Sequence, residues 1–179
     1  FLVLTLLTGI VYPAIVTAAA QTLFHYQANG SLVMKNGKLI GSELLAQKFQ
    51  GEKFFWSRPS AADYATVPSG ASNWGPTSAA LKNSVMKRTE SFRESNHLSK
   101  EIELPSDVVF ASGSGLDPHI SPEAARLQAN RVAKARNLSE EKRQSLYRLI
   151  DQSTETPQFG ILGKPRVNVF RLNLAVDSL

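Results

Sequence analysis

The chain has 179 residues, a formal net charge of +5 and no cysteine. The absence of cysteine excludes disulfide scaffolds, thiolate metal sites and cysteine nucleophiles. Basic residues cluster in 82–93 and 126–148, where acidic residues are interleaved with them. Such mixed charge is typical of solvated helix faces, so we expect no nucleic-acid partner.

The first 24 residues are apolar and carry no charge. As a helix they would extend roughly 36 Å, more than the hydrocarbon core of a bilayer, which is about 30 Å thick. A cleaved signal peptide is the alternative, because Ala18-Ala19-Ala20 resembles a cleavage site. The apolar run continues to Phe24, however, whereas signal peptides have apolar stretches of about 7–15 residues. We therefore predict a transmembrane helix over 1–24, followed by a polar linker over 25–30.

Three short elements are predicted after the linker. Residues 31–40 indicate a β-hairpin, because Asn36-Gly37 supplies the two positive-φ residues of a type I′ turn. Ser42 is placed to cap a short helix over 43–49, whose apolar residues have helical spacing. Residues 53–56 are aromatic and predict a short strand.

Residues 57–76 form a segment without periodicity that contains three prolines and two glycines. A stretch of about 20 residues without regular structure in a compact domain is usually functional or disordered. Its aromatic residues argue against disorder, so we predict an ordered interaction loop. The residues that we expect to contact partners are of types favoured at interfaces: Arg58, Tyr64, Asn73 and Trp74. Packing of Trp74 against its own domain is the alternative.

The remaining chain predicts three helices and two strands. Thr77 is expected to cap a helix that ends near residue 94, and Ser121 and Ser139 are expected to cap helices that end near 136 and 152. Residues 108–111 predict a buried strand. Residues 166–176 predict a longer strand, with a bulge near Phe170-Arg171 because the apolar alternation changes phase there.

The segment SGSGLDPHIS, residues 112–121, carries the sharpest local motif. A glycine-rich turn before a capped helix start can place backbone N–H groups around an anion. It is neither a Walker loop nor GxGxxG. The alternative is a tight strand-to-helix corner that needs glycine and a capping serine. The residues of this structural loop or anion site are Ser112, Gly113, Ser114, Gly115, Asp117, His119 and Ser121.

Catalytic chemistry has weak support in these residues. Ser114, Asp117 and His119 are the residue types of a hydrolase triad, which leaves a membrane-tethered serine hydrolase as an alternative function. The G-x-S-x-G motif is absent, however, and three triad members within one turn would align poorly. His25 and His97 are too distant in sequence to predict a metal site with His119. We expect no catalytic residue, cofactor or metal.

The predicted fold class is α+β. One N-terminal transmembrane helix precedes a single soluble domain over 31–179, in which several helices pack on a mixed or antiparallel sheet.

Five ordered blocks resemble a known family. They are RPSA, SGASNWGP, SGSGLDPHISPEAA, RVAKAR and GKPRVNVFRLNLAV, and with the uncharged N-terminal helix they cover nearly the whole chain. Together they are similar to the C subunit of the Kdp potassium-transporting ATPase. The chain departs from that family's pattern at Ala71, Trp74 and Phe170-Arg171.

The resemblance implies a non-catalytic accessory subunit of an ATP-driven potassium import complex. Its partners would be a channel-like subunit that carries potassium, a P-type ATPase subunit that hydrolyses ATP, and membrane lipid. It also implies location in the bacterial inner membrane, with the N-terminus cytoplasmic and the domain extracytoplasmic. The family subunit is further described as a catalytic chaperone that raises the ATP affinity of the ATPase subunit. The absence of a Walker loop predicts that any effect on ATP is indirect.

Overall fold

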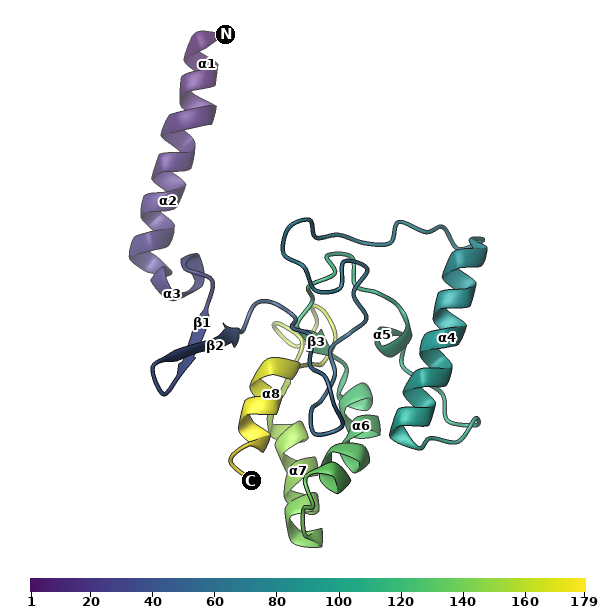
Figure 1. The fold of residues 1–179 in the computed structure, drawn as a ribbon. Helices are drawn as coiled ribbons and strands as arrows, with labels where there is room; N and C mark the ends of the chain where they lie inside the picture. The colour runs from purple at the N-terminus through teal and green to yellow at the C-terminus, as the bar shows by residue number, and fades with distance from the viewer. The chain divides into compact units, whose positions relative to one another are not determined.

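The computed structural model describes residues 1–179, which form two compact units, Phe1–Leu44 and Leu45–Leu179 (Figure 1). The unit boundary therefore follows Leu44, and the hairpin belongs with the N-terminal helix. In chain order the elements are α1 Leu2–Leu6, the π-helical turn η1 Leu7–Val11, α2 Tyr12–Leu23, α3 His25–Ala28, β1 Leu32–Lys35, β2 Lys38–Ser42, α4 Ala79–Asn96, α5 Ser106–Val109, β3 His119–Ile120, α6 Pro122–Ala135, α7 Glu140–Gln152, β4 Thr154–Glu155, β5 Arg166–Asn168 and α8 Val169–Val176.

The N-terminal helix runs without interruption from Leu2 to Leu23 and has a mean hydropathy of 2.0. By length and composition it is sufficient to cross a membrane. Its π-helical turn lies directly before Pro13, which has no N–H to donate to the preceding turn. The hydroxyls of Thr8 and Thr22 donate to backbone carbonyls one turn earlier, so they add no unpaired donor to the apolar surface.

The predicted hairpin and its turn are confirmed. β1 pairs antiparallel with β2, and Asn36 and Gly37 have φ values of 53° and 73°. The predicted helix over 43–49 is wrong, because Ser42 does not cap a helix. Its Oγ donates to the carbonyl of Gly30 at 2.6 Å and accepts from the N–H of Leu44 at 3.1 Å, so it closes the base of the hairpin.

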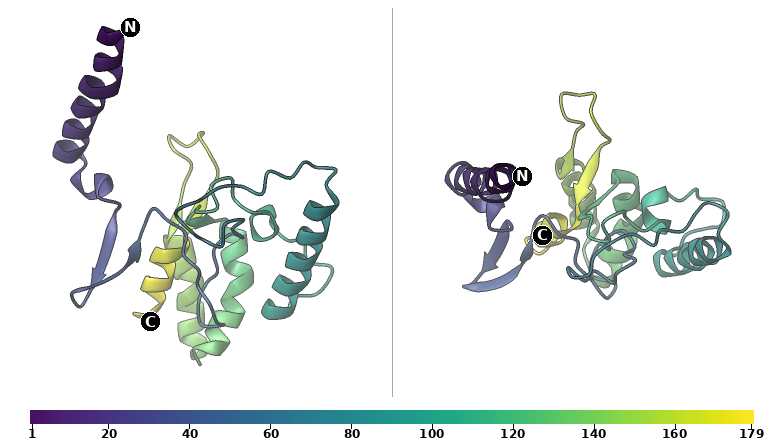
Figure 2. Two further views of the ribbon diagram at one scale, coloured as in Figure 1. Left: turned by 45° about the horizontal axis from the view of Figure 1, so that its top comes forward. Right: turned by 90° about the horizontal axis from the view of Figure 1, so that it is seen from above.

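The C-terminal unit has the predicted α+β composition, with a small antiparallel sheet in the order β3-β5-β4. The register pairs His119 with Asn168 and Thr154 with Val167. Two of its three strands have only two residues, so most of the core is helical. Figure 2 shows α6, α7 and α8 side by side below this sheet.

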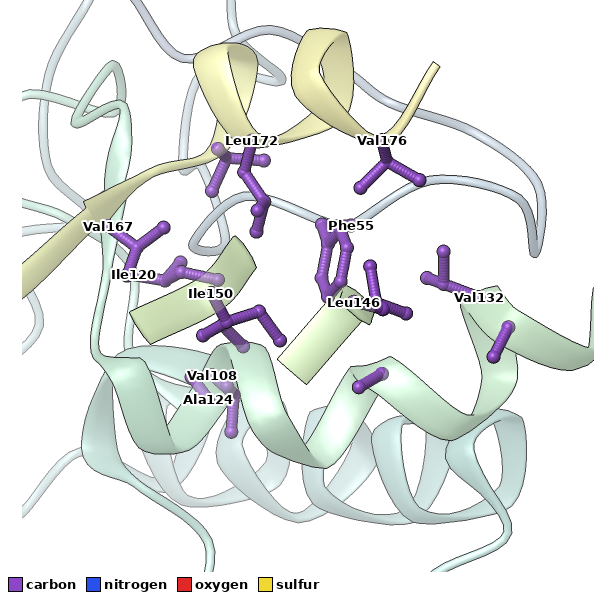
Figure 3. Packing of buried hydrophobic residues seen from close by; sticks show 14 of the residues in the cluster. Phe55, Val108, Ile120, Ala124, Val132, Leu146, Ile150, Val167, Leu172 and Val176 are labelled. Carbon is purple, nitrogen blue, oxygen red and sulfur yellow. The ribbon is translucent and has the colours of Figure 1, made fainter. Parts of the chain in front are cut away.

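The core forms where α6, α7 and α8 meet the extended segment before residue 57. Figure 3 shows the ring of Phe55 between Leu146 of α7 and the α8 residues Leu172 and Val176. Alanine residues on the inner face of α6 leave room for this ring: Ala124, Ala125 and Ala129, which are fully buried.

The predicted strand over 53–56 is wrong, because the chain turns at residues 52–54 and only Phe55 of the four is buried. Side-chain amides take the place of a neighbouring strand. Asn173 accepts from the N–H of Phe55 at 2.8 Å and donates to its carbonyl at 2.9 Å. Gln128 likewise accepts from the N–H of Trp56 at 2.7 Å and donates to its carbonyl. The segment therefore has strand-like hydrogen bonds without a strand partner.

The two other predicted strands are also corrected. Residues 106–109 form the helix α5 in place of the strand predicted over 108–111. The chain over 166–176 changes from β5 to α8 where a bulge was predicted, and Asn168 caps α8 by accepting from the N–H of Arg171. The phase change in apolar residues thus marks a change from strand to helix periodicity.

Helix starts were predicted more reliably. Ser121 and Ser139 cap α6 and α7 as expected, and each accepts from the N–H three residues later. The cap of α4 is Ser78 rather than Thr77, and that helix ends at residue 96.

Arg131 is a charged residue at the centre of this packing, and only 3% of its surface is exposed. Burial lowers its pKa to about 10, and the nearby charge of Glu52 partly offsets this effect. No carboxylate pairs with it, and its guanidinium lies 3.9 Å from the centre of the Trp56 ring. Its three nitrogens donate to neutral oxygens at 2.7–3.0 Å, which are the side-chain oxygens of Asn96 and Gln128 and the carbonyls of Glu52 and Phe54.

Replacement of Arg131 by methionine is expected to lower the free energy of unfolding by at least about 3 kcal/mol, because it leaves several buried acceptors without donors. Arg126→Met is the matched control on the same helix, since it removes only an exposed ion pair with Asp151 and should cost less than about 1 kcal/mol. Denaturant unfolding measures both. Equal losses in the two variants would contradict the role assigned to Arg131.

Candidate functional site

The two loops that the sequence singled out lie against each other. Arg58 of the first loop forms an ion pair with Asp117 of the second, with Nη1 and Oδ2 2.9 Å apart. The N–H of Ser112 donates to the carbonyl of Pro59 at 3.2 Å. The predicted interface loop and the predicted structural loop therefore form one structural unit.

Asp117 organises the second loop. One carboxylate oxygen accepts from the N–H of His119 at 3.0 Å and lies 3.3 Å from its Nδ1, while the other accepts from Arg58. Burial would raise the pKa of Asp117, but the hydrogen bonds from His119 and Arg58 outweigh burial and lower the pKa below 3.8. The carboxylate is therefore ionised at neutral pH and committed to contacts within the chain.

Gly115 allows the two loops to approach closely. Its φ of 72° is favourable for glycine, and a Cβ at this position would lie 2.9 Å from the carbonyl oxygen of Gly70 and 3.2 Å from Oγ of Ser60. By contrast, a Cβ on Gly113 would have no atom within 4 Å. Only one of the two glycines in the SGSG motif is required by packing.

The predicted interface residues have two different structural roles. Tyr64 braces its own loop, because its hydroxyl donates to the carbonyl of Arg58 at 2.8 Å and its N–H donates to Oγ of Ser60. Burial raises the pKa of Tyr64. The charge of Asp63 raises it further, and the charge of Arg88 partly offsets the rise. This tyrosine therefore remains neutral and acts as a support.

Trp74 lies in the exposed part of the same loop. Its side chain is 44% exposed, and its indole N–H has no acceptor within the chain. The preceding residue, Asn73, has a φ of 53°, a conformation that asparagine adopts more readily than most residues. The structure thus leaves the indole on the surface of a braced loop.

The start of α6 already has a carboxylate beside it. Asp107 accepts from the N–H of Ser121 at 2.6 Å and from its hydroxyl at 3.2 Å, while Ser121 caps the helix. Sequence reasoning missed Asp107, which precedes Ser121 by 14 residues and has no motif around it. An external anion at this helix start would meet that negative charge.

Ser114, Asp117 and His119 do not form the hydrogen-bonded series of a serine hydrolase. Oγ of Ser114 accepts from the N–H of Leu116 at 3.1 Å, and no hydrogen bond joins Ser114 to His119. The carboxylate of Asp117 lies 3.3 Å from Nδ1 of His119, but it is also paired with Arg58. These contacts stabilise the loop rather than activate a nucleophile.

An open cavity of about 1140 Å³ adjoins the ion pair. Arg58, Asp117 and His119 line it together with charged residues of both signs, which are Glu103, Asp107, Glu123, Arg126, Lys164 and Arg166. A second cavity of about 470 Å³ lies between α4 and the segment before the first loop, with Trp56, Tyr64 and Arg88 in its lining. Neither cavity has the convergent ligands of a metal site.

Substitution Gly115→Ala is expected to lower the free energy of unfolding by about 2–3 kcal/mol, since the new Cβ strains the backbone and meets Gly70. Gly113→Ala is the matched control and should change it by less than about 0.5 kcal/mol. Thermal unfolding of both variants tests the close contact between the loops. Equal stability of the two variants would contradict a close contact between the loops at Gly115.

Substitution Asp117→Asn is expected to cost about 1–2 kcal/mol at about pH 7, because charge-assisted hydrogen bonds are lost. The pKa of Asp117 is lower in the folded than in the unfolded chain, so its stabilising contribution exists above the unfolded pKa and is lost as pH falls through the folded pKa. The difference from the unmodified chain should therefore shrink as the pH falls below the unfolded pKa and through the folded pKa.

Denaturant unfolding across this pH range measures the effect. Asp151→Asn, which removes an exposed ion pair, serves as the control and should change stability by less than about 0.5 kcal/mol. A difference for Asp117→Asn that stays constant down to about pH 2 would refute the assignment.

Comparisons with known proteins agree over the whole chain. Residues 1–178 match the family described as "KdpC: K+-transporting ATPase, c chain". The chain is 52% identical to the potassium-transporting ATPase KdpC subunit of Rhodospirillum rubrum, over 99% of this chain and 91% of that protein. It is 50% identical to the KdpC subunits of Methylococcus capsulatus, over 99% and 93%, and of Polaromonas naphthalenivorans, over 100% and 91%. The chain therefore belongs to the KdpC family, the c chains of K+-transporting ATPases.

Proposed function

We propose that this chain is a non-catalytic accessory subunit needed for assembly of an ATP-driven potassium importer. Its partners are a channel-like subunit that carries potassium and a P-type ATPase subunit that hydrolyses ATP. The observation that carries this proposal is the family match over residues 1–178, because it includes both the apolar helix and the domain. Assembly through both parts would explain why the family retains them in one chain.

In this proposal the helix Leu2–Leu23 crosses the bacterial inner membrane with its N-terminus in the cytoplasm, and the domain lies on the outer side. The mean hydropathy of the helix supports a membrane span. A cysteine-free domain is suited to a compartment outside the cytoplasm, where thiols are readily oxidised.

The partner surface in this proposal is the loop of residues 58–76. Arg58 and Tyr64 form its support, through the ion pair with Asp117 and the hydrogen bond between the two residues. Trp74 and Asn73 then contact the partner. An exposed indole on a braced loop has the character of an interface hot spot, since little conformational entropy is lost when it is buried.

We further propose that the chain raises the ATP affinity of the ATPase subunit indirectly, by favouring the assembled conformation of the complex. A domain outside the membrane cannot contact cytoplasmic ATP. Thermodynamic linkage then requires the effect to be reciprocal, so ATP should strengthen assembly as much as assembly strengthens ATP binding. Reciprocity holds for either mechanism, so binding of ATP to the isolated chain, which an indirect effect does not predict, is what separates the two.

Truncation of Trp74 to alanine is expected to weaken assembly by about 2 kcal/mol, or roughly 30-fold in Kd, with no loss of domain stability. Co-purification of the three subunits from detergent extract and ATPase activity against ATP concentration are the measurements. Met86→Ala, which shortens an exposed apolar side chain on α4, is the matched control and should leave both unchanged. Unchanged assembly and activity for Trp74→Ala would contradict this interface, and a chain that purifies alone would contradict the subunit assignment.

A further inference from the structure

A narrow loop projects from the C-terminal domain between β4 and β5. Figure 2 shows it extending away from the helices, in the view from above. We call residues 156–165 the finger. Its tip carries three apolar side chains that face water, Phe159, Ile161 and Leu162, which are 85%, 82% and 56% exposed. Nothing else in the domain covers them, so the fold itself gains nothing from their apolar character.

The conformation of the finger tip is held by its own backbone. Gln158 and Leu162 exchange two hydrogen bonds of 2.9 Å, and the N–H of Gly160 donates to the carbonyl of Pro157 at 2.9 Å. Phe159 has a φ of 56°, which is unfavourable for a bulky side chain and is found mainly where function requires it. The tip therefore presents its side chains in a fixed arrangement, with most of its N–H groups already paired.

Charge along the finger changes in one direction from tip to base. Residues 156–163 carry no charge, and Lys164 follows them without a carboxylate partner. At the base, Arg166 and Arg171 lie 3.0 and 3.8 Å from Glu155, and Lys164 and Arg166 also line the cavity that contains Glu103, Asp107 and Glu123. An uncharged apolar tip followed directly by Lys164 is complementary to a bilayer, in which apolar chains lie beneath anionic phosphates.

A protein groove is less well matched to these features. A groove would accept the apolar tip, but it would not explain the basic residues behind the tip, Lys164, Arg166 and Arg171. Internal pairing of the tip backbone suits a medium without hydrogen-bonding partners, because unpaired N–H groups are costly there.

We propose that the finger inserts Phe159, Ile161 and Leu162 into the headgroup boundary of the bilayer, with Lys164 on the lipid phosphates. This inference rests on one part of the proposed function, namely that Leu2–Leu23 anchors the chain in the same membrane. A loop of this size binds a membrane weakly by itself. The anchor makes the second contact intramolecular, so a weak contact suffices to hold the domain in one orientation against the bilayer.

The absence of cysteine allows a direct test on the full chain. Ile161→Cys carries the only thiol and is labelled with an environment-sensitive fluorophore. The chain is then reconstituted without partner subunits in vesicles of phosphatidylethanolamine and phosphatidylglycerol. We expect blue-shifted emission, and quenching by spin-labelled lipid several-fold stronger than for a label at Gln144→Cys on the exposed face of α7. A higher proportion of phosphatidylglycerol in the vesicles should strengthen the quenching at position 161, and the substitution Lys164→Glu should weaken it.

The outcomes separate this inference from the proposed function. A label at Ala14→Cys reports on the apolar helix. Quenching at 14 without quenching at 161 overturns the finger proposal and leaves the membrane anchor intact. Absence of quenching at both positions overturns the anchor and the finger together. A label at 161 that moves to an apolar environment only when the partner subunits are added assigns the finger to a protein interface and overturns insertion into lipid.

Discussion

Burial of Phe55 is the constraint on which the C-terminal domain depends. Phe55 lies in the core without a neighbouring strand, so the backbone groups around it must find partners among side chains. Arg131 and Gln128 of α6 and Asn173 of α8 provide them. Arg131 donates only to neutral oxygens, so its charge is stabilised by these dipoles, by the Trp56 ring and by the nearby charge of Glu52, without an ion pair. These buried contacts add to the surface polar contacts between α6 and α7, such as the pair of Arg126 with Asp151.

The candidate site is built on this framework. Trp56 is the last residue of the extended segment, and the loop that begins after it carries Arg58 to Asp117. Where the two loops meet, the ion pair and the close approach at Gly115 limit their relative movement. Most of the polar residues that drew attention in the sequence are therefore used to build the site. The surface that we propose for a partner is therefore smaller, with the exposed indole of Trp74 in it.

Two kinds of contact would then determine how the domain acts in a potassium-transporting ATPase. The loop of residues 58–76 would bind protein, and the finger would bind lipid. Each would present exposed apolar side chains, Trp74 in the loop and Phe159, Ile161 and Leu162 in the finger. A subunit that works in this way affects ATP binding through the stability of the assembled complex, which is an energetic coupling and needs no nucleotide site of its own.

Local physical chemistry explains what could be predicted from the sequence. The apolar helix, the Asn36-Gly37 turn and the caps at Ser121 and Ser139 depend on residues within a few positions of one another, and all were predicted correctly. The ordered motifs also identified the family. The apolar run at 108–111 and the part of 166–176 after residue 168 were assigned to strands in error, because four to eight apolar residues fit either a strand or a buried helix.

Only the tertiary structure decided which distant residues meet. Arg58 and Asp117 are separated by 59 residues, and Phe55 and Asn173 by 118. Neither pair has a local pattern, because an ion pair or an amide contact between remote segments depends on how the helices pack. The sequence by itself therefore determined the apolar N-terminal helix, the starts of α6 and α7, and the family. Folding decided that two separate loops form one site and that buried amides replace a missing strand.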